Sequence, residues 1–176
     1  MVIIKERNDK KMITIRKSPK ADSRSTNMPP TVDELRNDTI SHITDVTNAL
    51  TFLSTLIKDR GHQHDNTKMS NMEEFHDALN SGHIKDTPWY KKHITEERHH
   101  LKSYIPKDVT LIDVIEHLAD CTMAGLARSG TVYDVDLSPE LLQLAAQNTV
   151  EMLKRNTKVI TDELLPNNDI LDEKSE

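Results

Sequence analysis

The chain of 176 residues has little of what several protein classes require. It has one cysteine, Cys121, which excludes an internal disulfide framework and a multi-cysteine zinc site. Only four glycines are present, which argues against a β-rich fold with many tight turns. The sequence has no apolar run long enough for a membrane span and no signal-peptide segment at the start. We therefore expect a cytoplasmic protein without membrane association.

Charge is distributed unevenly along the chain. Residues 1–30 carry eight Lys and Arg against three Asp and Glu, whereas the remainder carries fifteen against twenty-six, a net charge of −11. Prolines and serines in residues 17–30 indicate a linker. The predicted organisation is a basic segment and linker over 1–30, a helical domain over 31–156 and an acidic tail over 157–176. The acidic body disfavours nucleic acid as a partner.

The apolar pattern predicts an all-α fold, a single bundle of about five to six helices. Helix starts are indicated by capping-box patterns and by prolines in the first turn, at Thr31–Glu34, Thr87–Pro88, Thr110–Asp113 and Ser138–Pro139. The first helix is expected to end at Gly61 and to bury a face that includes His42. A small N-terminal β-hairpin could pair Val2–Ile4 with Met12–Ile15.

Histidine is unusually abundant, with nine residues, all between His42 and His117. Among them, the adjacent pair His64 and Asp65 is the strongest candidate for a metal site. An imidazole nitrogen and a carboxylate oxygen can bind one divalent cation where the backbone turns between them. Two further ligands must come from elsewhere. His42 and Asp120 are polar residues at positions where burial is expected, so both need partners.

These four candidates occur in a fixed order along the chain: His42, His64, Asp65 and Asp120. That order on predicted helices resembles the HD-domain superfamily of metal-dependent phosphohydrolases, over roughly residues 33–153. The string from His64 to Lys68 is similar to the HD-x-x-K form that is frequent in that superfamily. The resemblance implies an HD-domain-like helical bundle whose four ligands hold one or two divalent ions, chosen from Mn, Co, Ni, Fe, Zn and Mg.

The chain also resembles a family found largely in bacteriophages and described as of unknown function. The order in that family is H…HDxSKF…E…HH…NPHH…EMxxDW. The similar stretches here are His42, His64-Asp65-Asn-Thr-Lys68-Met69, Glu74, His93, Glu97-Arg98-His99-His100 and Glu116-His-Leu-Ala-Asp120. Departures at Thr67, Met69, Glu97-Arg98 and Cys121 leave the ligand positions intact. A phage-encoded chain would be located in the host cytoplasm.

A cluster of three histidines lies on the helix predicted to begin at Pro88. His93 and His100 are two turns apart on one face, while His99 is rotated away from them. We expect His93 or His100 to approach the metal or its bound phosphate, with both as candidate ligands of a second ion. The remaining histidine of the cluster is expected to be partly exposed.

Catalytic and substrate-binding roles are predicted for residues near these ligands. Asp65 is a candidate to bind metal and also accept a proton, and Lys68 can pair with it or reach a phosphate as a point charge. Arg98 and His99 are further candidates for binding the phosphate. Glu116, four residues before Asp120, is equally compatible with orienting a ligand and with a solvated helix edge.

The expected function is a metal-dependent phosphohydrolase that acts on a small phosphorylated substrate, with a nucleotide favoured, through water activated by the metal. One alternative is an HD-type di-iron oxygenase built on the same ligands. Another is a non-catalytic helical interaction protein with a structural metal or none, in which residues 1–30 bind the partner. The sequence is also compatible with a homo-oligomer.

Overall fold

The computed structural model describes residues 12–17 and 30–161, and helices dominate these residues, which confirms the predicted all-α fold. The chain separates into two compact units. The first contains the described parts of Met1–Phe52 and Asn156–Glu176, and the second is Leu53–Arg155. The region predicted as one helical domain is thus divided at residue 52. No helix among the described residues has both the length and the apolar character needed to cross a membrane.

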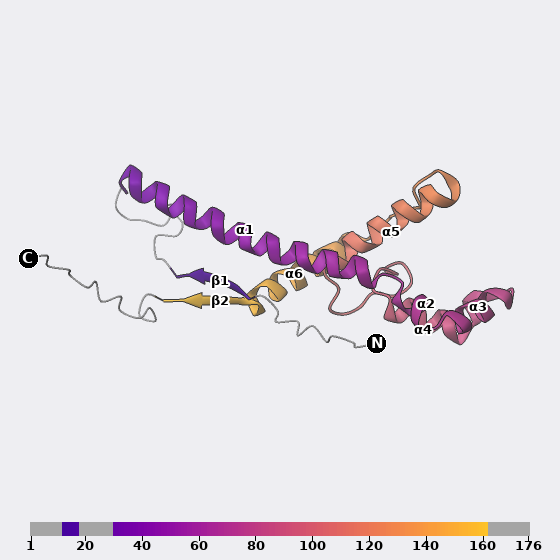
Figure 1. The fold of residues 1–176 in the computed structure, drawn as a ribbon. Helices are drawn as coiled ribbons and strands as arrows, with labels where there is room; N and C mark the ends of the chain where they lie inside the picture. The colour runs from indigo at the N-terminus through magenta and orange to yellow at the C-terminus, as the bar shows by residue number, and fades with distance from the viewer. Residues whose placement is uncertain (1–11, 18–29, 162–176) are drawn as a thin grey trace, which may run out of the picture. The chain divides into compact units, whose positions relative to one another are not determined.

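In the first unit, two short strands form a parallel sheet (Figure 1). Strand β1 (Ile13–Arg16) pairs with β2 (Thr157–Ile160), with Ile13 opposite Thr157. In the described part of the chain, the strand predicted at Met12–Ile15 is present and pairs with residues 157–160, which were assigned to the acidic tail. The stretch Val2–Ile4 lies outside the described residues. Parallel strands cannot be joined by a tight turn, so a local pattern does not reveal this pairing.

Helix α1 (Val32–Gln63) is the longest element of the described chain. It begins with the predicted capping box, since the backbone N–H of Thr31 donates to Glu34 Oε2 at 2.8 Å and that of Glu34 donates to Thr31 Oγ1 at 3.3 Å. The helix continues past Gly61, where it was expected to end. None of its described residues is buried: Leu50 is exposed, and Phe52, Leu53 and Leu56 are half-buried. The prediction that this helix buries one face is therefore wrong.

The second unit holds the last turns of α1 and the elements α2 (Asn66–Ser70), α3 (Met72–Asn80), the 3-10 helix η2 (Ile84–Asp86), α4 (Pro88–Glu96), α5 (Leu111–Ser129) and α6 (Pro139–Arg155). The sequence signals for three of these helix starts are confirmed. The Thr87 hydroxyl accepts a hydrogen bond from the backbone N–H of Tyr90 at 3.2 Å. The carboxylate of Asp113 accepts one from the backbone N–H of Thr110 at 2.7 Å. Helix α6 begins at Pro139, as predicted.

The apolar core of this unit consists of Leu101, Val109, Val114, Leu141 and Ala145. Two hydrogen bonds attach the N-terminus of α5 to α6. The Thr149 hydroxyl accepts from the backbone N–H of Leu111 at 2.9 Å, and the Asn148 amide donates to the carbonyl of Val109 at 2.8 Å. Helix α5 is therefore held firmly at its start. It carries Asp113, Glu116 and Asp120 at spacings of three and four, which place them near one face.

Candidate metal centre

Two groups of metal-capable side chains lie next to each other in the second unit. The first group is His64, His99 and Glu116, and the second group is Asp65, His93 and His100. Within each group, one nitrogen or oxygen atom per residue lies within 4.8 Å of the others. The six residues come from the turn after α1, from α4 and the loop that follows it, and from α5. Side chains from distant parts of the sequence therefore converge at one place.

The turn between α1 and α2 lets the adjacent residues His64 and Asp65 both contribute. The backbone of Asp65 adopts a left-handed conformation, with φ 57° and ψ 26°. It is the one non-glycine residue with positive φ in the described chain. Aspartate tolerates this region better than most residues, yet the conformation still costs free energy, and such residues cluster at functional sites. The turn predicted between the two side chains is present, with His64 Nε2 and Asp65 Oδ2 at 3.7 Å.

Helix α4 positions His93, and because the helix ends at Glu96, His99 and His100 lie in the segment that follows it. The ring of His93 is buried against Trp89, and its Nδ1 lies 2.6 Å from Thr67 Oγ1. The helix ends at Glu96, because Glu97 leaves it with an extended backbone and turns its carboxylate inward to accept the backbone N–H of Thr67 at 2.7 Å. The expected helix through His100 is therefore wrong.

This early helix end changes the prediction for His99. Because the residues after Glu96 are not helical, the rings of His99 and His100 lie side by side, with their centroids 4.2 Å apart. Only 1% of the His99 side chain is exposed, and His93 is buried too. The expectation that His99 is rotated away from the other two rings is thus incorrect, whereas the cluster does keep one partly exposed histidine, His100. His100 is half-buried and stays within the second group.

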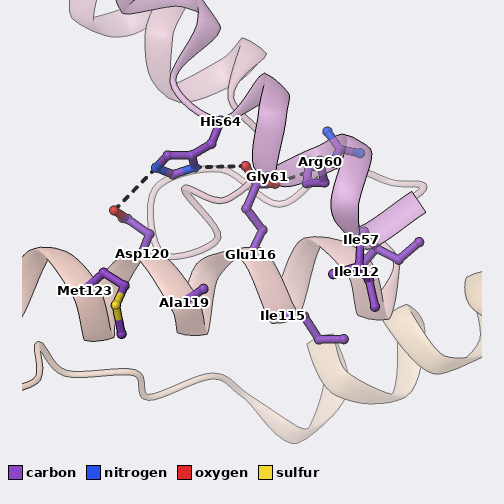
Figure 2. A pocket seen from close by; sticks show the side chains of 10 residues that line it. All are labelled: Ile57, Arg60, Gly61, His64, Ile112, Ile115, Glu116, Ala119, Asp120 and Met123. Atoms are coloured by element: carbon purple, nitrogen blue, oxygen red, sulfur yellow. Dashed lines mark hydrogen bonds and ion pairs between the residues drawn. The ribbon is translucent and has the colours of Figure 1, made fainter. Parts of the chain in front are cut away.

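In the first group, Glu116 lies between two imidazole rings. Its Oε1 is 3.1 Å from His64 Nδ1 and 3.3 Å from His99 Nδ1. On the opposite side of the His64 ring, Nε2 lies 3.6 Å from Asp120 Oδ1 (Figure 2). The backbone carbonyl of His99 lies 2.7 Å from His117 Nδ1, which fixes the segment that carries the His99 ring.

In the second group, Asp65 Oδ1 lies 3.7 Å from His93 Nε2 and 3.8 Å from His99 Nε2. His93 Nε2 and His100 Nε2 are 2.8 Å apart. When both rings are neutral, one Nε2–H donates to the lone pair of the other Nε2, so a cation bound by both nitrogens would have to replace that proton.

The two groups differ in protonation. Hydrogen bonds with Asp120 and Glu116 raise the pKa of His64 to about 10. The bond to His64 lowers the pKa of Asp120 to about 2, and the nearby His64 and His99 rings lower that of Glu116 to about 2 although burial alone would raise it. In contrast, burial lowers the pKa of His100 to about 4. In the metal-free protein near neutral pH, therefore, His64 is an imidazolium that must release a proton before it can bind a cation, whereas His100 is neutral.

Three buried polar atoms in these groups have no hydrogen-bond partner among the described residues: Asp65 Oδ1, His99 Nδ1 and Glu116 Oε2. A buried polar atom without a hydrogen bond costs about 1–3 kcal/mol, and in the described chain these three have only ion-pair contacts at 3.3–3.8 Å. A cation held by these atoms would offset that cost. Imidazole nitrogens with carboxylate oxygens are the donors that Zn, Mn, Fe, Co and Ni bind. The residues present thus fit a divalent metal ion.

The two cationic candidates have different surroundings. Lys68 pairs with Asp65 Oδ2, as the sequence spacing predicted. Arg98 instead forms a two-point contact with Asp113, at 2.8 Å and 2.9 Å, and a further ion pair with Asp108. These partners occupy its guanidinium and anchor the segment that carries the next residue, His99. Binding of a substrate phosphate by Arg98 stays a prediction.

His42 is the predicted ligand that the structure does not bring to these groups. It is exposed on α1, and uninterrupted helix separates it from His64 by about six turns. A continuous helix cannot fold back on itself, so the ligand set must be corrected. The other predicted ligands, His64, Asp65, His93, His100 and Asp120, do lie together, with Asp120 at the edge of the first group.

Two residues of the groups were not predicted as ligands. Glu116 was left open, although its place four residues before Asp120 on the most apolar helix was a usable signal, because a carboxylate there needs partners. His99 was assigned to phosphate binding, because the end of α4 at Glu96 was not foreseen.

Comparison with known proteins gives one family. The model of a family described as a family of unknown function (DUF5662) matches residues 31–165. No curated protein and no solved structure matches the chain. The family match covers well over half of the sequence and includes both groups of metal-capable side chains. The chain therefore belongs to DUF5662, a family of unknown function.

Proposed function

We propose that this protein is a metal-dependent phosphohydrolase that cleaves a small phosphate ester. The observation that carries the proposal is the adjacency of the two groups, His64–His99–Glu116 and Asp65–His93–His100, with Lys68 beside them. Their nitrogen and oxygen donors, three of which are buried without a hydrogen-bond partner among the described residues, fit one or two divalent ions.

A divalent ion bound by these residues supplies an activated water and offsets the charge of a phosphate. The chain's own residues would then orient the substrate and move the protons. Lys68 can exchange its contact with Asp65 for a phosphoryl oxygen, because the ammonium group is a point charge on a flexible stem. The Asp65 carboxylate, which has one buried oxygen without a hydrogen-bond partner in the described chain, is the candidate to accept the proton of the attacking water.

Access to this chemistry is through the side of the site formed by Asp120 and His100, which are less buried than His93 and His99. The buried rings on the inner side exclude water and keep the electrostatic interactions strong. This arrangement suits a substrate whose phosphate enters while the rest stays outside the groups. Small phosphate esters, including the mononucleotides favoured by the sequence, satisfy that requirement.

The proposal is tested with the purified full chain, stripped of metal by a chelator and reloaded separately with Mn, Co, Ni, Fe, Zn or Mg. Phosphate release is measured from mononucleotides and simple phosphate monoesters. We expect activity with at least one ion, and a loss of at least a hundredfold in Asp65→Asn. Asparagine tolerates the left-handed backbone of this turn, so the fold is kept. The matched control is His76→Gln, a substitution at an exposed histidine of α3.

Absence of turnover with every ion, or full activity in Asp65→Asn, would refute the hydrolase proposal. A second candidate is a di-iron oxygenase, which the close pairing of the two groups also favours. Oxygen uptake by the iron-loaded protein, without phosphate release, would support that alternative. Raised thermal stability on metal binding with neither activity would support a structural metal in an interaction protein.

A further inference from the structure

A pocket of about 310 Å³ opens next to the first group (Figure 2). Its walls come from the end of α1 and from α5, so all of it lies within the second unit. His64, Glu116 and Asp120 form one side, and Ile57, Ile115 and Met123 are among the aliphatic residues of the other sides. The volume is at the lower end of the range of small-molecule sites, about 300–1,000 Å³.

The polar side chains of the pocket contact one another. His64 is held between Glu116 and Asp120. The Arg60 guanidinium contacts Asp113 Oδ1 at 3.2 Å and Glu116 Oε2 at 3.5 Å. The other lining residues are aliphatic or glycine, so they offer no side-chain hydrogen bond to a base edge or a sugar hydroxyl, and no aromatic ring for stacking.

We propose that this pocket binds the organic part of the substrate, and that this part is apolar: an alkyl or similar hydrocarbon group esterified to phosphate. The inference rests on the proposed function for the phosphate end, since the phosphate would lie at the two groups while the hydrocarbon extends along α5. A nucleoside in this pocket would leave its ring nitrogens and hydroxyls without partners, at a cost for each. The pocket therefore favours apolar phosphate monoesters over nucleotides as substrates.

The position of the charges supports a small molecule as the occupant. One end of the pocket provides the side chains that fit a metal ion, and an anionic head is complementary to that ion. Apart from Arg60, whose guanidinium is held by Asp113 and Glu116, the remaining lining is apolar, which is complementary to a hydrocarbon tail. An amphiphilic phosphate ester matches both ends at once.

The test measures binding and turnover as functions of chain length. Straight-chain alkylphosphonates from methyl to octyl, which cannot be hydrolysed, are titrated calorimetrically into the metal-loaded protein, and the matching alkyl phosphates are used as substrates. Each buried methylene should tighten binding and raise kcat/KM about twofold to fourfold until the pocket is full. Adenosine 5′-phosphate and ribose 5-phosphate should gain nothing over methyl phosphate.

Variants on α5 locate the effect. Ile115→Gln and Met123→Gln replace pocket residues whose side chains are already partly in solvent, at 42% and 62% exposure, so the fold should tolerate them. Both should flatten the dependence on chain length. Leu118→Gln is the matched control, because Leu118 is 39% exposed on the same helix but does not line the pocket. This control should keep the full dependence.

The outcomes separate the pocket from the hydrolase proposal. Chain-length-dependent phosphonate binding without turnover of any ester would support the pocket and refute the hydrolase. Turnover that does not depend on chain length, or that favours adenosine 5′-phosphate, would overturn the pocket proposal and leave the hydrolase standing. An equal loss in Leu118→Gln would also overturn it. So would a dimer in light scattering that excludes the phosphonates, because the apolar surface would then be an interface with a second copy.

Discussion

Asp113 is the residue whose replacement should disturb the framework of the metal centre most clearly. It is fully buried in the first turn of α5. Its carboxylate accepts two hydrogen bonds from Arg98, contacts Arg60 at 3.2 Å and accepts the backbone N–H of Thr110. Replacement by Asn preserves the shape of the side chain but removes the charge. Two guanidinium groups would then face a neutral amide.

Breaking a buried ion pair by removing one partner costs about 3–5 kcal/mol. Both arginines keep about a quarter of their side-chain surface in solvent, which places the expected loss for Asp113→Asn near the lower value, about 3 kcal/mol. At about 4 °C per kcal/mol for a unit of roughly 100 residues, the melting temperature should fall by about 12 °C. Because Arg98 precedes His99, the variant should also bind metal more weakly.

The assay is thermal unfolding followed by circular dichroism, with Asp108→Asn as the matched control. Asp108 pairs with the same arginine, but 80% of its side chain is exposed, so its contribution should be below about 0.5 kcal/mol. An Asp113→Asn variant that melts within 2 °C of the wild type would refute the reasoning. Equal losses in both variants would refute it as well.

Other variants and conditions test further parts of the account. In chelator-treated protein, the His64 pKa of about 10 lies above its unfolded value of 6.5, so stability should fall as pH rises from 6.5 through 10, and His64→Gln should remove that slope in melting curves. Gly125→Ala should lower the melting temperature, because the added Cβ would clash with the backbone oxygen of Thr131. Gly61→Ala should raise it slightly, because no atom of the described chain lies near the added Cβ. Lys68→Met should lower kcat/KM for phosphate esters about tenfold or more, while Lys91→Met, at an exposed position, should not.

Local signals in the sequence accounted for much of the fold. Capping boxes and first-turn prolines depend on residues only three or four apart, and they placed the starts of α4, α5 and α6. The pairing of β1 with β2 joins residues more than 140 positions apart, so no local pattern could reveal it. The length and exposure of α1 were also missed, since apolar periodicity shows that a face exists but not what covers it.

The candidate site was predicted in part for similar reasons. His64 and Asp65 were predicted because an adjacent imidazole and carboxylate can bind one cation. Asp120 was predicted because a carboxylate on an apolar helix needs a partner. His99 was misplaced because one tertiary hydrogen bond, from the backbone N–H of Thr67 to Glu97, accompanies the end of α4 just before it. Such a contact depends on the folded arrangement and leaves no local trace in the sequence.

The most direct test of the central claim is the metal content of the purified full chain after equilibration with divalent ions and desalting, measured by elemental analysis. The account predicts that the wild type and His76→Gln retain the same one or two ions per chain. It also predicts that Glu116→Gln and Asp65→Asn each lose metal and that the double variant retains none, because the two substitutions affect different groups. A wild type that retains no divalent ion, or a double variant that retains as much as the wild type, would contradict the account.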